Sequence, residues 1–408
     1  MTTESPILTG LDIGTSGVTA VIAEWVPDET WKVIGVGRAP SNGLRRGVIV
    51  HLDRTIEAVR RALNDAQMMA GVECGVVHAG ISGDHIRGVN SRGVVAVSRR
   101  GGVIAADDVE RVLQAARAVP VPPDREVLHV LPQEFLVDGQ GGIQDPTGMV
   151  GARLEVAVHI ITASALAVSN VQHCIRHAGY ELGSLTLSPL AAAAASLTER
   201  DREMGVALVD IGAGLTGIVV AVDDAICHTA AVAIGGRNVT NDLAIGLRTP
   251  IDAAEAIKTE RGVALPELAT LEDLISVPSV GDQPPREVSQ RVIAAIVGPR
   301  LEEIFQLAKN EIRKAPGGDL LTAGIVLTGG GAAIPGAAHL AERIFDLPVR
   351  VARPEGLLGL SGLIEAPTDV GAAGLVRYAG RHGHAAVRRS GVVRRVAARI
   401  GNVLSELI

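Results

Sequence analysis

Aromatic residues are scarce in this chain of 408 residues, of which they make up only 2%. The core must therefore be built from aliphatic side chains, since hydrophobic residues still reach 47%. Charged residues account for 20%, and this balance excludes a disordered polypeptide. The length exceeds what one compact core usually holds, so the sequence predicts two or more packed subdomains.

The chain also has few cysteines and no excess of positive charge. Cys74, Cys174 and Cys227 lie far apart, which argues against a disulfide framework or a zinc site and favours a reducing compartment. A net charge of −7 argues against nucleic acid as a partner. The N-terminus has no features of a signal peptide. The uncharged stretch 320–338 contains Gly and Pro, which suit a strand, a turn and a helix start better than a membrane span.

Two segments half a chain length apart, residues 11–23 and 209–221, repeat one pattern. Each reads as a strand, an Asp-Ile-Gly turn and a second strand rich in β-branched residues. Glycine at such bends lets backbone N–H groups approach phosphate oxygens. Asp12 and Asp210 would repel phosphates unless they hold Mg²⁺, which we expect them to do through its waters. The residues expected around the phosphates are Asp12, Gly14, Thr15, Ser16, Gly17, Asp210, Gly212, Ala213 and Gly214.

A third segment, residues 325–331, reads as a buried strand that ends in Gly329, Gly330 and Gly331 before a helix. Such a turn lets a base or sugar lie against bare backbone, and a helix N-terminus favours negative charge. Each segment alone is compatible with an ordinary turn. Together, in this order and spacing, the three segments predict a nucleotide site.

Residues 212–217 also fit the G-x-G-x-x-G pattern of dinucleotide-binding proteins. That motif requires a helix next, whereas residues 218–222 here read as a strand. We therefore expect no Rossmann site. The sequence contains no G-x-x-x-x-G-K-[ST] phosphate loop either.

These segments resemble the actin/Hsp70/hexokinase superfamily and, over essentially the full length, the FtsA family. The resemblance rests on residues 11–17, 35–37, 43–47, 128–134, 205–214, 252–258, 277–281 and 327–331. The Pro-Gln-Glu run at 132–134 and the Val-Pro-Ser-Val-Gly run at 277–281 are its more specific parts. It implies an α/β, actin-like (ribonuclease H-like) two-domain fold with an inserted α+β 1C subdomain and a C-terminal amphipathic helix.

The resemblance also implies boundaries for the parts of this fold. They are 1–82 for the first part of subdomain 1A, 83–161 for the inserted subdomain 1C, 162–202 for the second part of 1A, 203–249 for the first part of 2A, 250–318 for 2B, 319–378 for the second part of 2A, 379–391 for a linker and 392–408 for a membrane-targeting helix.

The same resemblance implies ATP and Mg²⁺ as cofactors. Glu255 and Lys258 should lie beside the ribose and adenine, with a surface ion pair as the alternative. Gly235, Gly236 and Asn238 should border the nucleotide. The second hairpin departs from the superfamily pattern, which has Gly, Thr and Asp where this chain has Ala213, Leu215 and Gly217. The missing hydroxyl and carboxylate predict at most a weak ATPase, and we identify no catalytic residue.

The last seventeen residues combine an apolar stripe with arginines. Steps of three and four residues place the stripe on one side of a helix, and such a helix suits the surface of an anionic membrane. The alternative is a helix docked on the protein's own core. The residues expected at the membrane are Val393, Arg394, Arg395, Val396, Arg399, Ile400, Val403, Leu404 and Leu407.

The FtsA resemblance implies a protein that anchors the FtsZ ring to the cytoplasmic face of the cell inner membrane at the division site. The C-terminal peptide of FtsZ should bind subdomain 2B near Arg300 and Glu303. Self-association into filaments and binding of other division proteins through 1C are also implied. Two alternatives share the fold: a pilus-assembly actin homologue, which normally lacks the tail, and a small-molecule kinase, for which we find no catalytic Asp.

Overall fold

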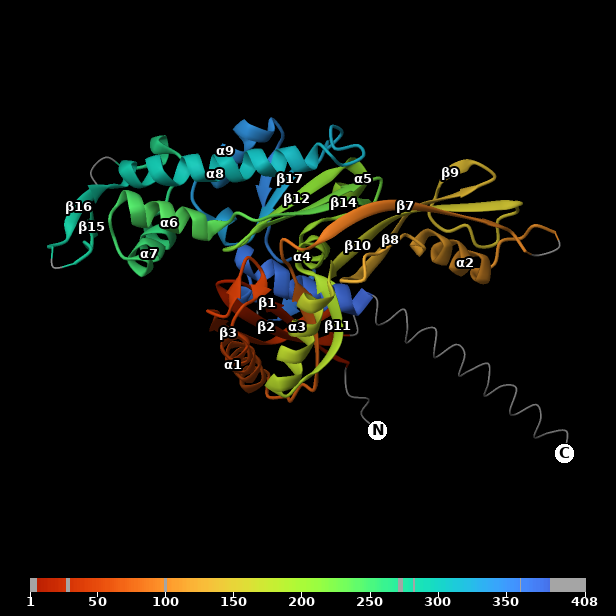
Figure 1. Ribbon diagram of the computed structural model, residues 1–408, viewed down its shortest axis with the longest axis horizontal. Coiled ribbons are helices and arrows are strands. Elements are labelled where there is room, and N and C mark those ends of the chain that lie inside the picture. The colour runs from red at the N-terminus through yellow and green to blue at the C-terminus, as the bar shows by residue number, and fades with distance from the viewer. Residues whose placement is uncertain are drawn as a thin grey trace.

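The computed structural model describes residues 6–26, 30–98, 101–270, 274–281, 283–359 and 361–381. Two sheets with their helices form the centre of the molecule, and two further parts extend from the second sheet in opposite directions (Figure 1). The predicted membrane-targeting helix, residues 392–408, and most of the predicted linker lie outside the described residues.

The first sheet has six strands in the order β11-β6-β1-β2-β3-β19. Helix α1 (Leu52–Ala70) lies directly on β3, because Gly35 and Gly37 leave room for it. A Cβ atom on Gly37 would come within 1.9 Å of the Ala62 carbonyl oxygen, so this contact requires glycine. The strands are β1 (Ile7–Ile13), β2 (Gly17–Val26), β3 (Thr30–Pro40), β6 (Val76–Ile81), β11 (Glu181–Leu187) and β19 (Leu357–Gly359).

The second sheet repeats the pairing of the first, as the repeated sequence pattern predicts. In the first sheet β1 pairs antiparallel with β2 and parallel with β6; in the second, β12 pairs antiparallel with β13 and parallel with β17. Its order is β14-β13-β12-β17-β18, with β12 (Val206–Ile211), β13 (Thr216–Val222), β14 (Ala225–Val232), β17 (Gly324–Thr328) and β18 (Val349–Val351). Residues 218–222 therefore lie in a strand, β13, as predicted, and a Rossmann turn is excluded.

Residues 83–162 include a small α+β unit with its own sheet, in the order β7-β10-β8-β9. One helix packs on this sheet, and Ile104, Val112, Leu154 and Ile160 are buried between them. The α+β insertion is thus confirmed as a feature of the fold. Its elements are β7 (Arg87–Ala96), α2 (Ala106–Arg117), β8 (Arg125–Val137), β9 (Gln140–Ile143) and β10 (Arg153–Ser164).

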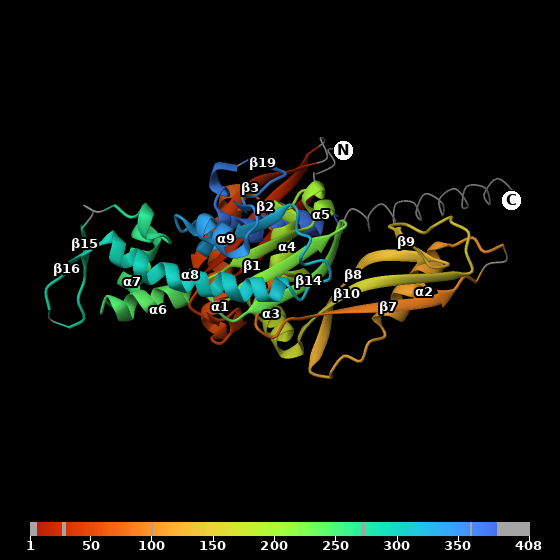
Figure 2. The same ribbon diagram turned by 90° about the horizontal axis from the view of Figure 1, so that it is seen from above.

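At the opposite end of the long axis lies a second extension, which is mainly helical (Figures 1 and 2). Helix α8 (Gln290–Ile312) runs from this extension to the second sheet, where Phe305 contacts Phe345 of α9 (Ala337–Phe345). The other elements of the extension are α6 (Gly236–Gly246), α7 (Ile251–Arg261), η1 (Pro266–Leu268), β15 (Leu274–Val277) and β16 (Arg286–Ser289).

The end of the described chain differs from the predicted boundary of 2A. Strand β19 pairs with β3 of the first sheet, and the helical residues 370–381 pack on that sheet too. Gly10 permits this contact, since a Cβ there would lie 2.7 Å from the Ala372 carbonyl oxygen. The predicted segment 319–378 is therefore shared between the two sheets. The remaining elements are β4 (Leu44–Arg45), β5 (Val48–Ile49), α3 (Ala165–Ala178), α4 (Ser188–Ser196), α5 (Glu199–Met204), η2 (Gly330–Ala333), η3 (Ser361–Leu363) and η4 (Pro367–Asp369).

A buried histidine joins the insertion to the second sheet. His159 on β10 is 1% exposed, and its Nδ1 and Nε2 lie 2.6 Å from Asn90 Oδ1 and 2.9 Å from Thr229 Oγ1. Burial, with the charge of His228 nearby, lowers the pKa of His159 to about 4, so the ring is neutral at neutral pH. Asn90 Nδ2 donates to the Cys227 carbonyl, which leaves Asn90 Oδ1 to accept from His159 Nδ1–H.

Replacing His159 with Leu should destabilise the protein by about 1–3 kcal/mol, because Asn90 and Thr229 would lose their buried partner. The free energy of unfolding in urea measures this loss. His339→Leu is the matched control, since His339 is exposed on α9. Equal stability of the two variants would show that the contact does not hold the insertion in place.

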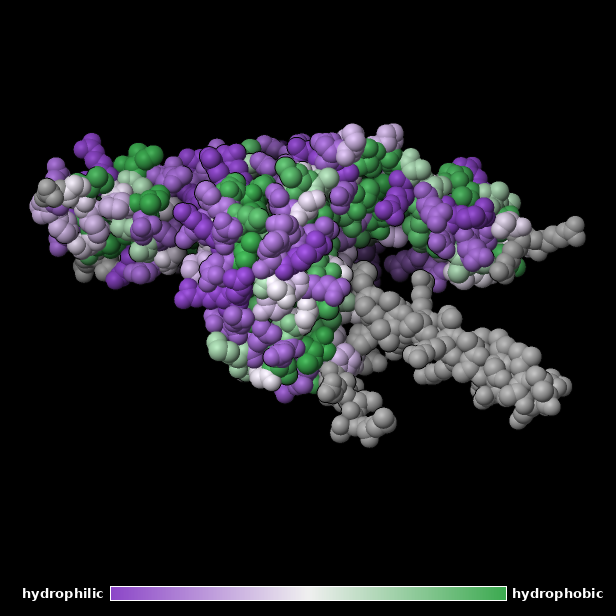
Figure 3. Space-filling model, turned by 60° about the horizontal axis from the view of Figure 1, so that its bottom comes forward, coloured by the Kyte–Doolittle hydropathy of each residue, from purple (hydrophilic) through white to green (hydrophobic). Residues whose placement is uncertain are grey.

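Hydrophilic and hydrophobic residues alternate in small groups over the face that Figure 3 shows. Among the residues that the structure describes, no helix is long and apolar enough to cross a membrane. This agrees with the sequence interpretation of residues 320–338, which form β17, the short η2 turn and the start of α9.

Candidate nucleotide site

A cavity of about 520 Å³ lies where the two hairpins meet. It brings together most of the residues expected at the nucleotide, although they come from segments two hundred residues apart. Further lining residues are Val18, Thr19, Arg38, Ala39, Pro40, Ser82, Ser188, Leu215, Thr259, Ile334, Pro367, Thr368, Asp369 and Gly371. The predicted residues on its wall are Asp12, Gly14, Thr15, Ser16, Gly17, Asp210, Gly212, Ala213, Gly214, Gly236, Glu255, Lys258, Gly329, Gly330 and Gly331.

The same backbone hydrogen bond closes the turn of each hairpin. Gly14 N–H donates to the Gly17 carbonyl at 2.9 Å, and Gly212 N–H donates to the Leu215 carbonyl at 3.0 Å. In the sheets, Asp12 pairs with Thr19, and Asp210 pairs with Gly217. The two aspartates thus occupy equivalent positions, one residue before the end of their strands. This places both carboxylates at the cavity.

The two carboxylates lie in an environment that disfavours their charge. Burial raises the pKa of Asp12, and the Ser188 hydroxyl, which donates to Asp12 Oδ1 at 3.3 Å, only partly offsets this. Burial and the neighbouring charge of Asp12 raise the pKa of Asp210 to about 7. Neither carboxylate has an ion-pair partner among the described residues. Two half-buried carboxylates in this state fit a divalent cation, whose charge would offset both effects.

The triple glycine at the end of β17 forms the third wall. Gly329 has a φ of +80°, and a Cβ there would lie 2.6 Å from Asp210 Oδ1. A Cβ on Gly331 would lie 2.3 Å from Ile211 Cγ2, whereas Gly330 has only Thr368 Cγ2 near, at 3.7 Å. The following element is the four-residue 3-10 helix η2, and α9 begins only at Ala337. The expected helix start directly after the glycines is therefore a 3-10 turn.

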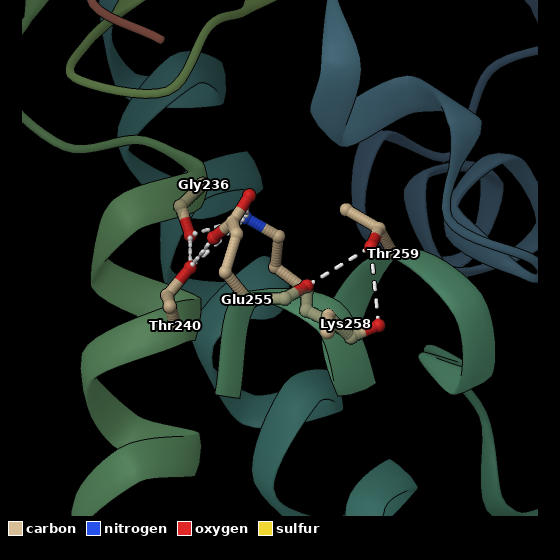
Figure 4. A network of polar contacts seen from close by, with 6 residues as sticks. Gly236, Thr240, Glu255, Lys258 and Thr259 are labelled. Atoms are coloured by element: carbon tan, nitrogen blue, oxygen red, sulfur yellow. Dashed lines mark hydrogen bonds and ion pairs between the residues drawn. The ribbon is translucent and has the colours of Figure 1, made fainter. Parts of the chain in front are cut away.

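Glu255 and Lys258 lie on one face of α7, as their spacing predicts, and contact α6 (Figure 4). Lys258 Nζ lies 2.7 Å from Glu255 Oε2 and donates to Thr240 Oγ1 at 2.9 Å. It also donates to the Gly236 carbonyl at 3.3 Å. The Lys258 side chain is 10% exposed and that of Glu255 is 49% exposed, so the pair lies at the cavity with its carboxylate open to solvent. Contact of the two side chains with ribose and adenine stays a prediction.

Gly235 and Asn238 are placed differently from the other expected residues. A Cβ on Gly235 would lie 2.5 Å from the Gly212 carbonyl oxygen, so Gly235 packs behind the second hairpin. Asn238 Oδ1 accepts from Gly235 N–H at 3.1 Å, and Asn238 lines a separate, smaller cavity. Their contact with a nucleotide stays a prediction.

The structure adds residues that sequence motifs did not indicate. The Ser188 hydroxyl donates to Asp12, and Arg38 forms an ion pair with Asp369 at 2.7 Å in the cavity lining. Thr328 Oγ1 donates to the Pro367 carbonyl at 2.9 Å and fixes the segment that returns to the cavity. No sequence motif marked this segment.

Arg300 and Glu303 lie on α8, in the helical extension and away from the cavity lining. Arg300 Nη2 donates to Asp242 Oδ1 at 3.0 Å, and its guanidinium also pairs with Glu303. The two residues predicted for a partner peptide thus form one network with α6.

Comparison with solved structures defines the class of this protein. It shares its fold with the PilM–PilN type IV pilus biogenesis complex, with a TM-score of 0.66 and 18% identity over 91% of this chain and 98% of that one. MreB 5 of Spiroplasma citri bound to AMPPNP is similar too, with a TM-score of 0.57 and 14% identity over 95% and 99%. The protein therefore has the actin-like fold, and the fold class predicted from the sequence is confirmed.

Sequence relatives identify the family. The chain is 45% identical to the cell division protein FtsA of Pseudomonas aeruginosa, over 91% of this chain and 89% of that protein, and 36% identical to that of Escherichia coli, over 99% and 97%. The family model described as cell division protein FtsA matches residues 207–374, and that of the SHS2 domain inserted in FtsA matches residues 83–162. The chain belongs to the FtsA family of cell division proteins. This supports neither the kinase nor the pilus-assembly alternative.

Proposed function

We propose that this chain binds ATP with Mg²⁺ in the cavity between its two sheets and anchors FtsZ to the membrane. The observation that carries the nucleotide part is the convergence of both Asp-led hairpins and the triple glycine on one cavity. Backbone N–H groups at bare glycine turns suit phosphate oxygens. The similarity of the fold to MreB 5, solved with AMPPNP, supports the same proposal.

Asp12 and Asp210 are the residues that would hold Mg²⁺ here. When bound, the ion would offset the charge of the phosphates and of both carboxylates. Thr15 and Ser16 follow Asp12 on the first hairpin and line the same cavity, where we expect them to border the phosphates. We propose that Glu255 and Lys258 border the sugar and base, and their position in the cavity wall on the α7 side supports this.

Mg²⁺ binding should weaken at acid pH, because a proton on Asp210 competes with the metal. The raised pKa of about 7 means that Asp210 is increasingly protonated below neutral pH. The apparent Mg²⁺ affinity should therefore fall by about tenfold for each pH unit below 7, as one proton is displaced on binding. Titration of Mg²⁺ against a fluorescent ATP analogue, between pH 5.5 and pH 8, measures the slope. In Asp210→Asn the slope should flatten; an equal slope in both proteins would assign the proton to another group.

Hydrolysis at this site is proposed to be weak. Gly217 stands where many superfamily members have Asp, and a Cβ on Gly217 would lie 2.3 Å from Pro189 Cγ. A carboxylate therefore has no room at this position. Leu215, where a Thr is common, is 7% exposed and adds no hydroxyl. The site is thus better suited to hold ATP than to position a water for attack.

The helical extension at the α8 end is the proposed site for the C-terminal peptide of FtsZ. Arg300 is half-buried and Glu303 is exposed on α8, and Asp242 fixes the guanidinium of Arg300. The insertion lies at the opposite end of the molecule, so partners at the two ends would not compete for space (Figure 1). We further propose self-association into filaments, other division partners at the insertion and an inner-membrane location at the division site.

Recruitment of FtsZ to vesicles tests this proposal directly. FtsZ should sediment with anionic liposomes only when the full chain is present. Arg300→Ala should reduce the FtsZ in the pellet by roughly fivefold or more, since hydrogen bonds to charged groups contribute about 1.5–3 kcal/mol. Arg313→Ala, at the end of the same helix, is the matched control. Failure of FtsZ to pellet with the wild-type chain bound to liposomes would exclude the anchoring role.

A further inference from the structure

A second, smaller cavity lies behind the two hairpins. Its volume is about 110 Å³, and it shares Thr15 and Gly214 with the larger cavity. These two residues therefore separate the two spaces. The lining consists of Thr15, Arg45, Arg46, Gly214, Arg237, Asn238 and Asn241.

The wall between the cavities is thin and closely packed. A Cβ on Gly214 would lie 2.8 Å from Thr15 Oγ1 and 3.0 Å from Arg46 N. Thr15 Oγ1 accepts a hydrogen bond from Gly47 N–H at 3.1 Å, which ties the loop that carries both arginines to the first hairpin. Thr15 itself is 7% exposed. A ligand in the small cavity would thus touch the backbone that holds the phosphates of a nucleotide.

All the charged residues that line the small cavity are arginines. Arg45, Arg46 and Arg237 form no ion pair with a carboxylate of the described residues, and no carboxylate lines the cavity. Arg237 and Asn238 belong to the first turn of α6, whose dipole adds positive potential at that end. All three arginines are exposed residues, so an anion from solvent can reach their guanidinium groups at the cavity.

We propose that this cavity binds inorganic phosphate. Its volume of about 110 Å³ is roughly a fifth of the 520 Å³ of the larger cavity, so it suits a small tetrahedral oxyanion better than a nucleotide. Planar guanidinium groups bind phosphate oxygens through paired N–H groups, and Asn238 and Asn241 offer further amide donors. The inference rests on the proposed nucleotide site only for its role: bound phosphate would report that the neighbouring cleft has released a γ-phosphate.

The phosphate could come from solution, from ATP hydrolysis or from a lipid headgroup, and the probes distinguish these sources. Inorganic phosphate is titrated by calorimetry into the full-length chain saturated with ADP and Mg²⁺, against chloride of equal ionic strength. Glycerol 3-phosphate serves as the headgroup probe. We expect phosphate to bind more tightly than glycerol 3-phosphate, because all four of its oxygens can meet the arginine and asparagine donors, whereas one oxygen of glycerol 3-phosphate is esterified.

The test variant is R45Q/R46Q/R237Q, which should bind phosphate at least roughly tenfold more weakly, since each lost charge-assisted contact counts for about one factor of ten. The control variant, R54Q/R61Q/R176Q, removes the same charge from exposed arginines on α1 and α3 and should bind phosphate as the wild type does. ADP affinity is measured in the same samples and should not change in either variant.

Three results would overturn the phosphate site: no binding beyond that of chloride, equal binding in test variant and wild type, or tighter binding of glycerol 3-phosphate. Equal binding in the test variant and the wild type would mean that phosphate binds in the larger cavity, where the γ-phosphate of ATP would lie. If the wild-type chain does not bind ADP at all, that separate result would contradict the proposed nucleotide site and not the phosphate site.

Discussion

Gly330→Leu should abolish ATP binding and leave the fold intact. Gly330 lines the nucleotide cavity, and its nearest neighbour for a Cβ is Thr368 Cγ2 at 3.7 Å, an ordinary contact distance. A leucine there has room at its base but extends into the space proposed for the ribose and base. A clash of about 3 kcal/mol in the bound state lowers affinity by roughly a hundredfold or more.

Binding of a fluorescent ATP analogue, with thermal unfolding of the same samples, measures both parts of this prediction. Gly75→Leu is the matched control, because Gly75 has open space around it and lies outside the cavity lining. Gly331→Leu is the opposite case: its Cβ would lie 2.3 Å from Ile211 Cγ2, so this variant should lose stability as well. Wild-type ATP affinity in Gly330→Leu would mean that the nucleotide binds elsewhere.

The hairpins could be predicted from the sequence because their signals are local. Asp12-Ile13-Gly14 and Asp210-Ile211-Gly212 each combine a strand period with a turn residue, and a strand pair of this kind closes within a few residues. From the repeat, the same strand pairing could be expected in both sheets. The insertion was recognisable for a similar reason, since its strands and its helix follow one another in the chain.

Other features depend on contacts between distant segments, which sequence periodicity does not encode. Ser188 meets Asp12 across 176 positions, and Arg38 meets Asp369 across 331. Strand β19 has only three residues, and its pairing with β3 returns the end of the described chain to the first sheet. The small arginine cavity is of the same kind, because β4 and α6 bring its charges together from opposite halves of the chain.

Removing residues 392–408 should abolish binding of this chain to anionic liposomes. In the sequence, Val393, Val396 and Ile400 begin an apolar stripe at helical spacing, and arginines lie beside it. Apolar burial at the headgroup boundary and about 1 kcal/mol per arginine near an anionic surface act together. Loss of both should lower the partition coefficient by at least roughly a hundredfold, and co-sedimentation with vesicles of known anionic content measures it.

A matched pair of variants separates the stripe from the charge. Ile400→Glu with Leu404→Glu places two carboxylates on the apolar side, whereas Ala398→Glu with Asn402→Glu places them on the opposite side of the same helix. Both pairs change the net charge equally, so anionic lipid repels them equally. A larger loss of binding in the first pair would show that the helix lies with its apolar stripe in the membrane. Equal losses in the two pairs would mean that the tail binds the membrane by charge alone. Full binding by the chain that lacks residues 392–408 would show that the tail does not anchor the protein.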